Sequence, residues 1–182
     1  MNFEKTALKD LIVIQPEVFE DQRGYFFESF NKKIFDDNIG YDLNFIQDNQ
    51  SKSFFGVLRG LHYQSPPFEQ AKLVRVLDGK VLDIAVDIRK NSPTFGHHLS
   101  VELSDQNKKQ LFIPRGFAHG FVTLSKYAIF QYKVDNKHAP DFEKGIIFND
   151  KDLAINWQIN QRDIKLSNKD SKHPTLKYAE VL

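Results

Sequence analysis

Short segments in which apolar and polar residues alternate, separated by turns rich in Gly, Pro, Asn and Asp, run through most of this chain. A period of two residues is typical of β-strands with one buried face, and many such segments favour an all-β fold. The segments that we predict as strands are Leu11–Gln15, Tyr25–Phe30, Leu43–Gln47, Gly56–Gln64, Leu73–Leu77, Val81–Ile88, Leu99–Leu103, Gln110–Ile113, Gly120–Leu124 and Ala128–Val134. This pattern predicts a double-sheet jelly roll or a small barrel, a class of fold that binds ligands in its mouth.

Helical signal is confined to two short segments. Asn31–Asn38 is long enough for a short helix, and Asp150–Ile155 begins with a residue suited to cap a turn. Asp78-Gly79 has the composition of a two-residue hairpin turn, in which glycine supplies the positive φ. Other reversals are expected at Ser92–Thr94 and Ile113–Gly116.

The composition fits one domain, residues 1–182, with an aromatic-rich core, because 41% of the residues are hydrophobic and 17 are Phe. A formal net charge of +1 gives no electrostatic case for a nucleic acid or an anionic membrane as partner. The absence of cysteine excludes disulfides, thiolate metal sites and cysteine catalysis. No apolar signal core or long apolar run is present, so we expect a cytoplasmic protein. Residues 168–182 look polar and are expected at the surface.

His62 and Lys72 stand on neighbouring apolar strands, where neither residue type is usually buried without a partner. A lone histidine on a strand is more often structural, but the missing side chain at Gly60 leaves space for a ligand. Strict alternation places Arg59 on the opposite face from His62, unless a bulge re-aims it. A lysine at a strand end often keeps its amine in solvent, whereas an inward Lys72 would stabilise an oxyanion. The pair suggests a base and an electrophile that face one cavity.

Two segments, Gly56–His62 and Pro114–His119, raise the question of a metal site. They match parts of the metal motif of cupins, and their two histidines, with Glu69 as a third candidate, would be the ligands. The motif requires a further histidine two residues after the first, where this chain has Gln64, a poor ligand for a transition metal. Lys72 would also repel a cation. The sequence therefore favours a site without metal.

Tyr132 and Asp170 are ambiguous when each is taken alone. A tyrosine on an apolar strand is commonly a core residue with its hydroxyl at the rim, although a phenol also serves as a proton donor. Asp170 resembles a surface turn residue, and it becomes interesting only if the tail folds back against His62. The remaining histidines lie in polar, loop-like surroundings and are expected to be solvated: His97, His98 and His173.

Longer motifs extend in a fixed order across nearly the whole chain: Asp21–Phe30, Gly56–His62, Gln70–Val76, Asp87–Gly96, Ile113–Phe121, Gly145–Asp150 and Leu166–Asp170. Together they resemble the dTDP-4-dehydrorhamnose 3,5-epimerase family, cofactor-free cupins of bacterial dTDP-L-rhamnose and polysaccharide biosynthesis. The resemblance implies a cupin-type double-sheet jelly roll with a few short peripheral helices. It also implies a homodimer that acts on a nucleotide sugar, without nucleic acid, membrane or metal.

The resemblance implies a role for each catalytic residue. His62 would remove a proton from the carbon beside the 4-keto group. Asp170 would orient the imidazole of His62 and favour its charged form. Lys72 would steady the enolate oxygen, and Tyr132 would return a proton on the opposite face. No cofactor is implied, because a ketone already acidifies both neighbouring C–H bonds. The implied reaction is epimerisation at C3 and C5 of dTDP-4-dehydro-6-deoxy-D-glucose to dTDP-4-dehydro-L-rhamnose.

The resemblance also points to a set of substrate-binding residues: Arg23, Glu28, Gln47, Asp48, Asn49, Arg59, His119, His138, Glu143 and Lys169. Arginines suit the diphosphate because their forked donors pair with two oxygens. In the family, the strand of Arg23 reaches into the partner subunit's site. His138 stands where the family usually has a tyrosine that stacks on thymine, and stacking is worth ~1–3 kcal/mol per base.

Three alternatives stay open on the sequence alone. The nearest is an epimerase that acts on one carbon, or on another nucleotide 4-keto sugar, because His138 departs from the family pattern. A metal-dependent cupin isomerase or oxygenase is opposed by Gln64. A non-catalytic binder of sugar nucleotides leaves the combination of His62, Lys72 and Tyr132 unexplained.

Overall fold

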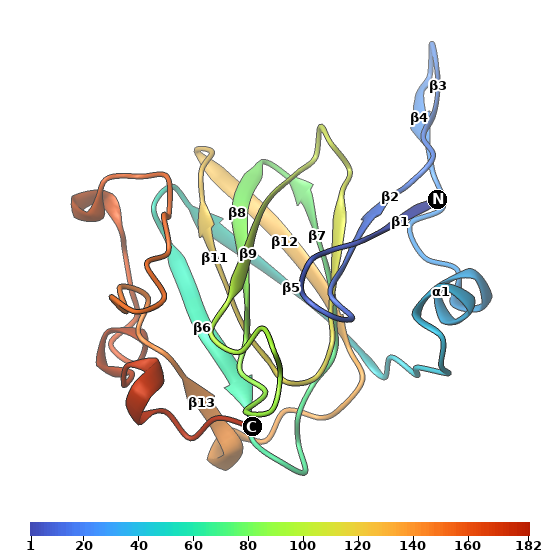
Figure 1. Ribbon diagram of the computed structural model, residues 1–182. Helices are drawn as coiled ribbons and strands as arrows, with labels where there is room; N and C mark the ends of the chain where they lie inside the picture. The colour runs from blue at the N-terminus through green and yellow to red at the C-terminus, as the bar shows by residue number, and fades with distance from the viewer.

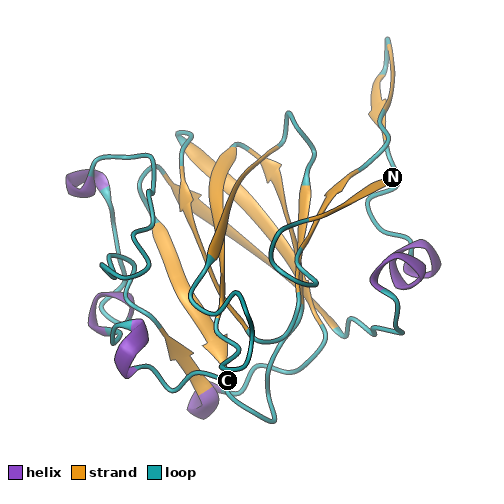
Figure 2. Cartoon of the chain, viewed as in Figure 1, coloured by secondary structure: helices purple, strands orange, loops and turns teal.

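The computed structural model describes residues 1–182 and consists mainly of β-strands arranged in two facing sheets (Figures 1 and 2). The strands are β1 Asn2–Lys5, β2 Ile12–Gln15, β3 Phe19–Asp21, β4 Gly24–Phe26, β5 Gln47–Phe54, β6 Leu58–Gln64, β7 Lys72–Asp78, β8 Lys80–Asp87, β9 His98–Ser104, β10 Gln110–Ile113, β11 Phe117–Thr123, β12 Tyr127–Val134 and β13 Glu143–Gly145. One sheet has the order β1-β2-β10-β7-β12-β5, and the other has the order β13-β6-β11-β8-β9. All named pairs are antiparallel, and the predicted cupin-type jelly roll is confirmed.

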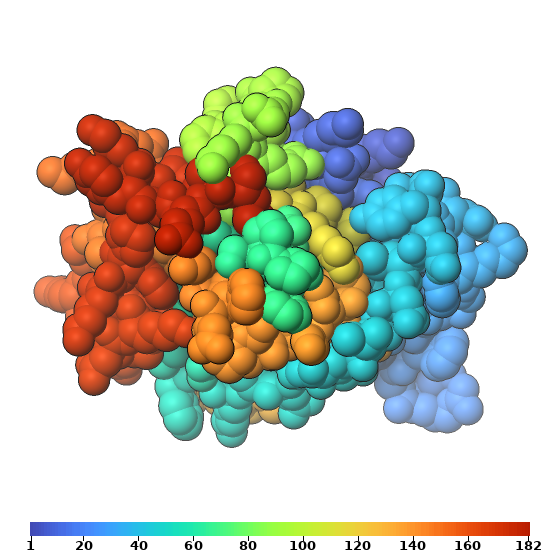
Figure 3. Space-filling view, turned by 90° about the horizontal axis from the view of Figure 1, so that it is seen from below, coloured from blue at the N-terminus to red at the C-terminus, as the bar shows by residue number.

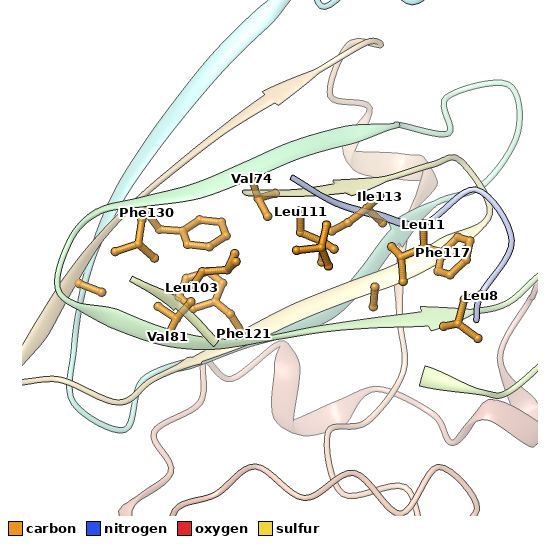
Figure 4. Packing of buried hydrophobic residues seen from close by; sticks show 14 residues of the cluster. Leu8, Leu11, Val74, Val81, Leu103, Leu111, Ile113, Phe117, Phe121 and Phe130 are labelled. Atoms are coloured by element: carbon orange, nitrogen blue, oxygen red, sulfur yellow. The ribbon is translucent and has the colours of Figure 1, made fainter. Parts of the chain in front are cut away.

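Apolar residues of both sheets fill much of the space between them (Figure 4). Val74 of β7 and Phe130 of β12 come from one sheet, and Phe121 of β11 comes from the other. The rings of Phe121 and Phe130 stack with their centroids 4.2 Å apart. Burial of each such side chain stabilises the fold by roughly 1.5–3 kcal/mol, which is why alternation in the sequence specifies which face turns inward.

The outer face of the β6–β11–β8 region is covered by the C-terminal part of the chain. Residues from Ile146 to Leu182 pack there as a second apolar cluster that includes the buried Trp157. The backbone N–H of Leu182 donates to the carbonyl of Ile88 at 3.2 Å. Figure 3 shows this segment in red along one side of the molecule, opposite the helical segment in cyan. Residues 168–182 lie at the surface as predicted, except that Asp170 is buried and that their few apolar side chains pack against this layer.

Asp150 ties this outer layer together. Its Oδ1 accepts the backbone N–H groups of Asp152 and Leu153, as the predicted cap requires, and its Oδ2 accepts that of Leu176 at 2.6 Å. The tail forms short 3₁₀ turns rather than helices. The 3₁₀ turns of the chain are η1 Pro140–Phe142, η2 Gln161–Asp163, η3 Asp170–Lys172 and η4 Leu176–Tyr178.

The predicted helix is present as α1, Lys32–Ile39. Asn31 caps its start by accepting the N–H of Ile34 at 3.2 Å, and Gly40 ends it with a φ of +86°. Phe35 faces the outer side of the larger sheet and meets the ring of Phe112 edge-on at 5.1 Å. No helix of the chain has the length and apolar character needed to cross a membrane.

Two predicted strands are wrong. The predicted strand Leu43–Gln47 is not a strand, because Leu43 and Phe45 pack against the helix instead of joining the sheet. The strand β5 begins only at Gln47 and was missed, since its sequence is polar where it faces a cavity. Of Tyr25–Phe30, only Tyr25 and Phe26 belong to a strand, β4. The short strands β1, β3 and β13 were also missed, and β11 begins at Phe117 rather than at Gly120.

The turn at Asp78-Gly79 is present, but it is not a hairpin. Gly79 has the expected positive φ of +85°, yet β7 and β8 belong to different sheets. The turn therefore carries the chain from one wall of the sandwich to the other. Composition alone does not separate these cases, because both need a residue with positive φ.

The pair β3–β4 forms a hairpin that projects away from the sandwich at one corner (Figure 1). Phe19, Tyr25 and Phe26 expose 58%, 56% and 70% of their surface. Large apolar side chains on a projecting hairpin mark a surface that another chain covers in many proteins.

Candidate active site

A cavity of about 400 Å³ lies between the two sheets and holds most of the polar residues singled out in the sequence. β5, β7 and β12 form one wall, β6 and β11 form the opposite wall, and the loop before η3 closes one side. The lining residues are Asn49, Gln50, Ser51, Arg59, His62, Lys72, His119, Phe121, Phe130, Tyr132, Ser167, Lys169 and Asp170. Of these, Gln50, Ser51, Phe121, Phe130 and Ser167 were not named from the sequence.

A bulge in β6 brings Arg59 and His62 to the same face. His62 pairs with His119 of β11, and Arg59 pairs with Phe121, so two residues of β6 stand opposite one of β11. The extra residue reverses the alternation, and both side chains line the cavity. This resolves the question that strict alternation left open at Arg59.

Gly60 is required by the backbone at this bulge. Its φ is +118°, and a Cβ atom would lie 2.6 Å from the Cα of Gly120 and from the carbonyl oxygen of His119. The glycine thus allows β6 and β11 to approach each other. The interpretation that it leaves space for a ligand is wrong, because that space is occupied by the neighbouring strand.

His62 forms a pair with Asp170, which arrives from the C-terminal tail. The distance from His62 Nε2 to Asp170 Oδ1 is 2.6 Å, and only 5% of the Asp170 side chain is exposed. Ser167 Oγ accepts the backbone N–H of Asp170 at 3.0 Å and fixes the turn. Burial raises the pKa of Asp170, but the hydrogen bond and charge of His62 and the bond with Ser167 outweigh it, so the pKa is lowered. An ionised Asp170 accepts the Nε2–H of His62 and leaves Nδ1 free as a base.

Lys72 begins β7 and lines the cavity from the wall opposite His62. Burial lowers the pKa of Lys72 to about 8, although the negative charges of Asp83 and Glu143 oppose that shift. The amine is therefore largely a cation at neutral pH, in a place where little water screens it. A developing oxyanion in the cavity would be stabilised by this charge.

Tyr132 lies on β12, where it pairs with Asn49 of β5 and Val74 of β7. Burial raises the pKa of the Tyr132 phenol, while the charge of Arg59 opposes that shift. The phenol is therefore protonated at neutral pH and is a proton donor. Because β12 and β6 belong to different sheets, the phenol and the imidazole of His62 line the cavity from opposite walls.

His119 is held by a carboxylate that the sequence reading missed. His119 Nε2 lies 3.0 Å from both carboxylate oxygens of Asp83, and both residues are buried. Burial lowers the pKa of His119, although Asp83 opposes the shift. An Asp within the apolar strand β8 was the available signal for this partner, since buried carboxylates are rare without one.

The arrangement considered for a metal, with ligands from His62, His119 and Glu69, does not form. His119 Nε2 is already occupied by Asp83, and Glu69 does not line the cavity. Gln64 bonds to backbone groups, donating to the carbonyls of Phe68 and Lys137 and accepting the N–H of Ala139. Its role here is to hold two loops together.

An ionic network stands at the rim of the cavity. Glu143 of β13 lies 2.7 Å from Lys169 Nζ and 3.2 Å from His138 Nε2. Burial raises the pKa of Glu143, but the hydrogen bonds with Lys169 and His138 outweigh it and leave the pKa lowered. Lys169 lines the cavity, whereas His138 stands outside it, more than half exposed.

Besides His138 and Glu143 at the rim, four further predicted binding residues do not line the cavity within one chain. Arg23 is 90% exposed near the tip of the β3–β4 hairpin, where it pairs with Asp21. Asp48 pairs with Lys133 at 2.9 Å, on the face of β5 that points away from Tyr132. Two others make local bonds: Gln47 with Asn49 at 2.7 Å, and Glu28 with Asn31 at 3.2 Å.

His173 was expected in solvent, and that prediction is wrong. Only 10% of its side chain is exposed, because it follows η3 and packs behind Asp170. A histidine three residues after an aspartate is close to it in a 3₁₀ turn, so the Asp170-x-x-His173 spacing was a usable signal. His97 is exposed as expected, while His98 is half-buried on β9.

Comparisons with known proteins agree on one group of relatives. A family model described as dTDP-4-dehydrorhamnose 3,5-epimerase matches residues 5–178. The dTDP-4-dehydrorhamnose 3,5-epimerase of Salmonella typhimurium is 52% identical over 175 residues, which are 96% of this chain and 95% of the relative. The crystal structure of the enzyme of that name from Elizabethkingia anophelis is similar with a TM-score of 0.94, at 52% identity over 97% of each chain.

A second solved structure carries a ligand. It is a dTDP-6-deoxy-D-glucose-3,5-epimerase from Legionella pneumophila in complex with dTDP-4-keto-L-rhamnose. It is similar to this chain with a TM-score of 0.93, at 46% identity over 97% of this chain and 93% of the other.

Proposed function

Because this chain belongs to the dTDP-4-dehydrorhamnose 3,5-epimerase family, we propose which of its residues carry out the family's reaction, and how. The protein is an isomerase that epimerises dTDP-4-dehydro-6-deoxy-D-glucose at C3 and C5 to give dTDP-4-dehydro-L-rhamnose. One observation carries the assignment of residues: the His62–Asp170 pair and the Tyr132 phenol line one cavity from opposite walls. Inversion of a carbon needs a base on one face and an acid on the other.

His62 is the base in this proposal. Its free Nδ1 takes the proton from the carbon beside the C4 ketone, and the electron pair of the C–H bond moves into the enolate, whose charge rests on the C4 oxygen. Asp170 stabilises the imidazolium that forms, since its carboxylate accepts the Nε2–H. The ammonium of Lys72 stabilises the enolate oxygen.

Tyr132 completes the inversion. Its phenol donates a proton to the carbon on the face opposite His62, and the enolate electrons return to form the new C–H bond. His62 then carries one extra proton and Tyr132 lacks one. Solvent exchange restores both groups before the second carbon reacts. Acid–base groups suffice for this chemistry, so the proposal needs no cofactor.

Substrate binding is proposed for polar residues at the cavity and its rim. Arg59, Asn49 and Lys169 line the cavity, and Lys169 is joined to Glu143 and through it to His138. The guanidinium of Arg59 is suited to the diphosphate. His119, held by Asp83, is suited to hydrogen bond the sugar.

A homodimer would account for the predicted binding residues that lie away from the cavity. The β3–β4 hairpin carries Arg23, and three of its aromatic side chains are exposed. We propose that the hairpin packs against a second copy and brings Arg23 toward that copy's cavity, with Glu28, Gln47 and Asp48 near the contact. The proposal also treats residues 1–182 as one jelly-roll domain acting in the cytoplasm. Packing of the tail on the sheet supports the single domain, whereas the cytoplasmic location rests on the expectation from the sequence.

The reaction is tested by NMR with dTDP-4-dehydro-6-deoxy-D-glucose in deuterated water. Deuterium at both C3 and C5 of the product is the expected result. Deuterium at one carbon only would make the protein a single-carbon epimerase, and none at either would contradict the proposal. His62→Ala is expected to abolish exchange while the circular dichroism spectrum stays unchanged. Retained turnover in that variant would remove His62 from the role of base.

A further inference from the structure

His173 is a buried histidine for which the proposed reaction has no use. Nine-tenths of its side chain is covered, and its Nε2 makes no hydrogen bond. That nitrogen points toward Asp170, with Oδ1 3.5 Å away. The imidazole rings of His62 and His173 meet edge-on, with centroids 5.6 Å apart and planes at 77°. A buried nitrogen without a partner, facing a carboxylate, requires an explanation.

The position of the His173 ring is fixed by the backbone beside it. A Cβ atom at Gly145 would lie 2.5 Å from His173 Nε2, so the ring occupies the space that only glycine leaves open. On the other side, η3 holds Asp170 and His173 one turn apart. The nitrogen is therefore held near the His62–Asp170 pair by two independent elements.

Together, one ring nitrogen of His62, one carboxylate oxygen of Asp170 and one ring nitrogen of His173 lie within 4.8 Å of one another. In a tetrahedral zinc site, metal–ligand bonds of ~2.0–2.2 Å place neighbouring ligand atoms roughly 3.3 Å apart. The distances of 2.6 Å and 3.5 Å from Asp170 Oδ1 to the two nitrogens fall on either side of that value. Small side-chain rotations would bring all three atoms to a shared ion.

We propose that His62, Asp170 and His173 form a binding site for a divalent transition-metal ion, and that this ion inhibits the epimerase. Two imidazoles and one carboxylate suit Zn²⁺ and its neighbours rather than Mg²⁺ or Ca²⁺, which prefer oxygen ligands. The binding rests on geometry alone, whereas the inhibition rests on the proposed role of His62.

The inhibition follows from the chemistry of the imidazole ring. A metal on Nε2 of His62 uses the lone pair of that nitrogen, so the ring proton moves to Nδ1. Nδ1 is the nitrogen that accepts the substrate proton in the proposed reaction. With a hydrogen already there, it has no lone pair and the base is lost. The ion also takes the carboxylate oxygen that stabilises the imidazolium.

Binding is tested by titrating Co²⁺ into the full chain, prepared without a histidine tag and stripped with a chelator. We expect one Co²⁺ ion to bind per chain and to give the visible absorption of four-coordinate Co²⁺. Zn²⁺ is expected to displace the Co²⁺ ion and abolish that absorption. His173→Gln is expected to weaken binding by more than about 100-fold, because loss of an outer-shell partner alone costs 10–100-fold. The control is the double variant His97→Gln/His98→Gln, which removes two adjacent histidines elsewhere and is expected to bind normally.

A second measurement needs no variant. In the wild-type protein, Zn²⁺ is expected to shift the ring ¹H–¹⁵N signals of His62 and His173 and to leave those of His119 unchanged. Zn²⁺ is also expected to stop deuterium exchange into the substrate, and a chelator to restore it. Absence of stoichiometric binding, or binding that survives His173→Gln, would overturn the site. Full exchange activity of the zinc-loaded protein would overturn the inhibition, while no exchange even in the stripped protein would count against the proposed function instead.

Discussion

Lys72 is the residue whose chemistry depends most on its surroundings. An ordinary lysine stays a cation far above neutral pH, with a pKa near ~10.4. Burial lowers the pKa of Lys72 to about 8, so its charge is lost just above the physiological range. A group that acts as a cation in the transition state then limits activity on the alkaline side.

We expect kcat/KM to fall as pH rises through about 8, because the deprotonated amine no longer stabilises the enolate. The Tyr132 phenol does not cause this fall, since burial raises its pKa. In Lys72→Arg the residual activity is expected to persist to higher pH, because a guanidinium keeps its charge. The measurement is a pH profile of turnover for both proteins. An alkaline limb at the same pH in both would exclude Lys72 as its origin.

Tyr132 offers a test that separates proton removal from proton return. In Tyr132→Phe, formation of the inverted product is expected to fall by about 10²–10⁴-fold, the usual contribution of a general acid. Exchange of deuterium with retained configuration is expected to continue, because His62 still removes and returns a proton on its own face. NMR of the recovered substrate measures both. Tyr127→Phe is the matched control, since that phenol is on the same strand but bonds to Asp78. Equal loss of exchange and inversion in Tyr132→Phe would contradict this division of roles.

At the scale of elements, the β3–β4 hairpin is unlike the rest of the chain. It pairs only with itself, stands away from both sheets and exposes its aromatic side chains (Figure 1). An isolated two-stranded hairpin is marginally stable in water. A surface that covers the hairpin would therefore stabilise it.

Phe26→Asp is expected to convert a dimer into a monomer, because Phe26 is 70% exposed and a charge there cannot be buried in an apolar contact. Light scattering coupled to size-exclusion chromatography measures the mass. Activity is expected to fall with the dimer, because Arg23 would no longer reach the partner's cavity. Tyr178→Asp, at a residue that is 74% exposed on η4, is the control and should leave the mass unchanged. A wild-type monomer with full activity would contradict the dimer proposal.

At the scale of the whole molecule, three apolar clusters hold the sandwich and its coverings together. The buried carboxylate of Asp87 stands where β8 ends and the next loop begins. Burial raises the pKa of Asp87, but hydrogen bonds from Arg89, Ser92 and Thr94 outweigh it and lower the pKa to about 2. Stability thus depends on this carboxylate being ionised.

Because the pKa of Asp87 is lowered by folding, the free energy of unfolding falls as the solution becomes acidic. The ionised Asp87 contributes about 2 kcal/mol to the free energy of unfolding above pH ~4, and this contribution is lost as pH falls toward about 2. Asp87→Asn is expected to lower stability near neutral pH and to flatten its dependence over that acid range. Urea unfolding at several pH values measures this, with the exposed Asp37 replaced by Asn as control. An unchanged acid dependence in Asp87→Asn would show that other groups carry it.

The alternation of apolar and polar residues was sufficient to predict most strands of the sandwich. β2, β6, β7, β8, β9, β10 and β12 were predicted because at least one face of each is apolar, and the jelly roll followed from their number. β5 was missed for the opposite reason: its inward residues, such as Asn49 and Ser51, line a polar cavity. A strand that faces a site loses the apolar pattern by which strands are found.

The sequence by itself determined the class of fold, the helix at Lys32–Ile39 and a set of polar residues whose combination suggests acid–base chemistry. Only the tertiary structure placed Asp170 on His62, Asp83 on His119 and His173 behind the pair. It also turned Arg59 into the cavity through the bulge in β6. The physical reason is the separation along the chain of the residues in contact. Alternation reports which face of a strand is buried, whereas these contacts join residues far apart in the chain, or depend on one inserted residue that reverses a face.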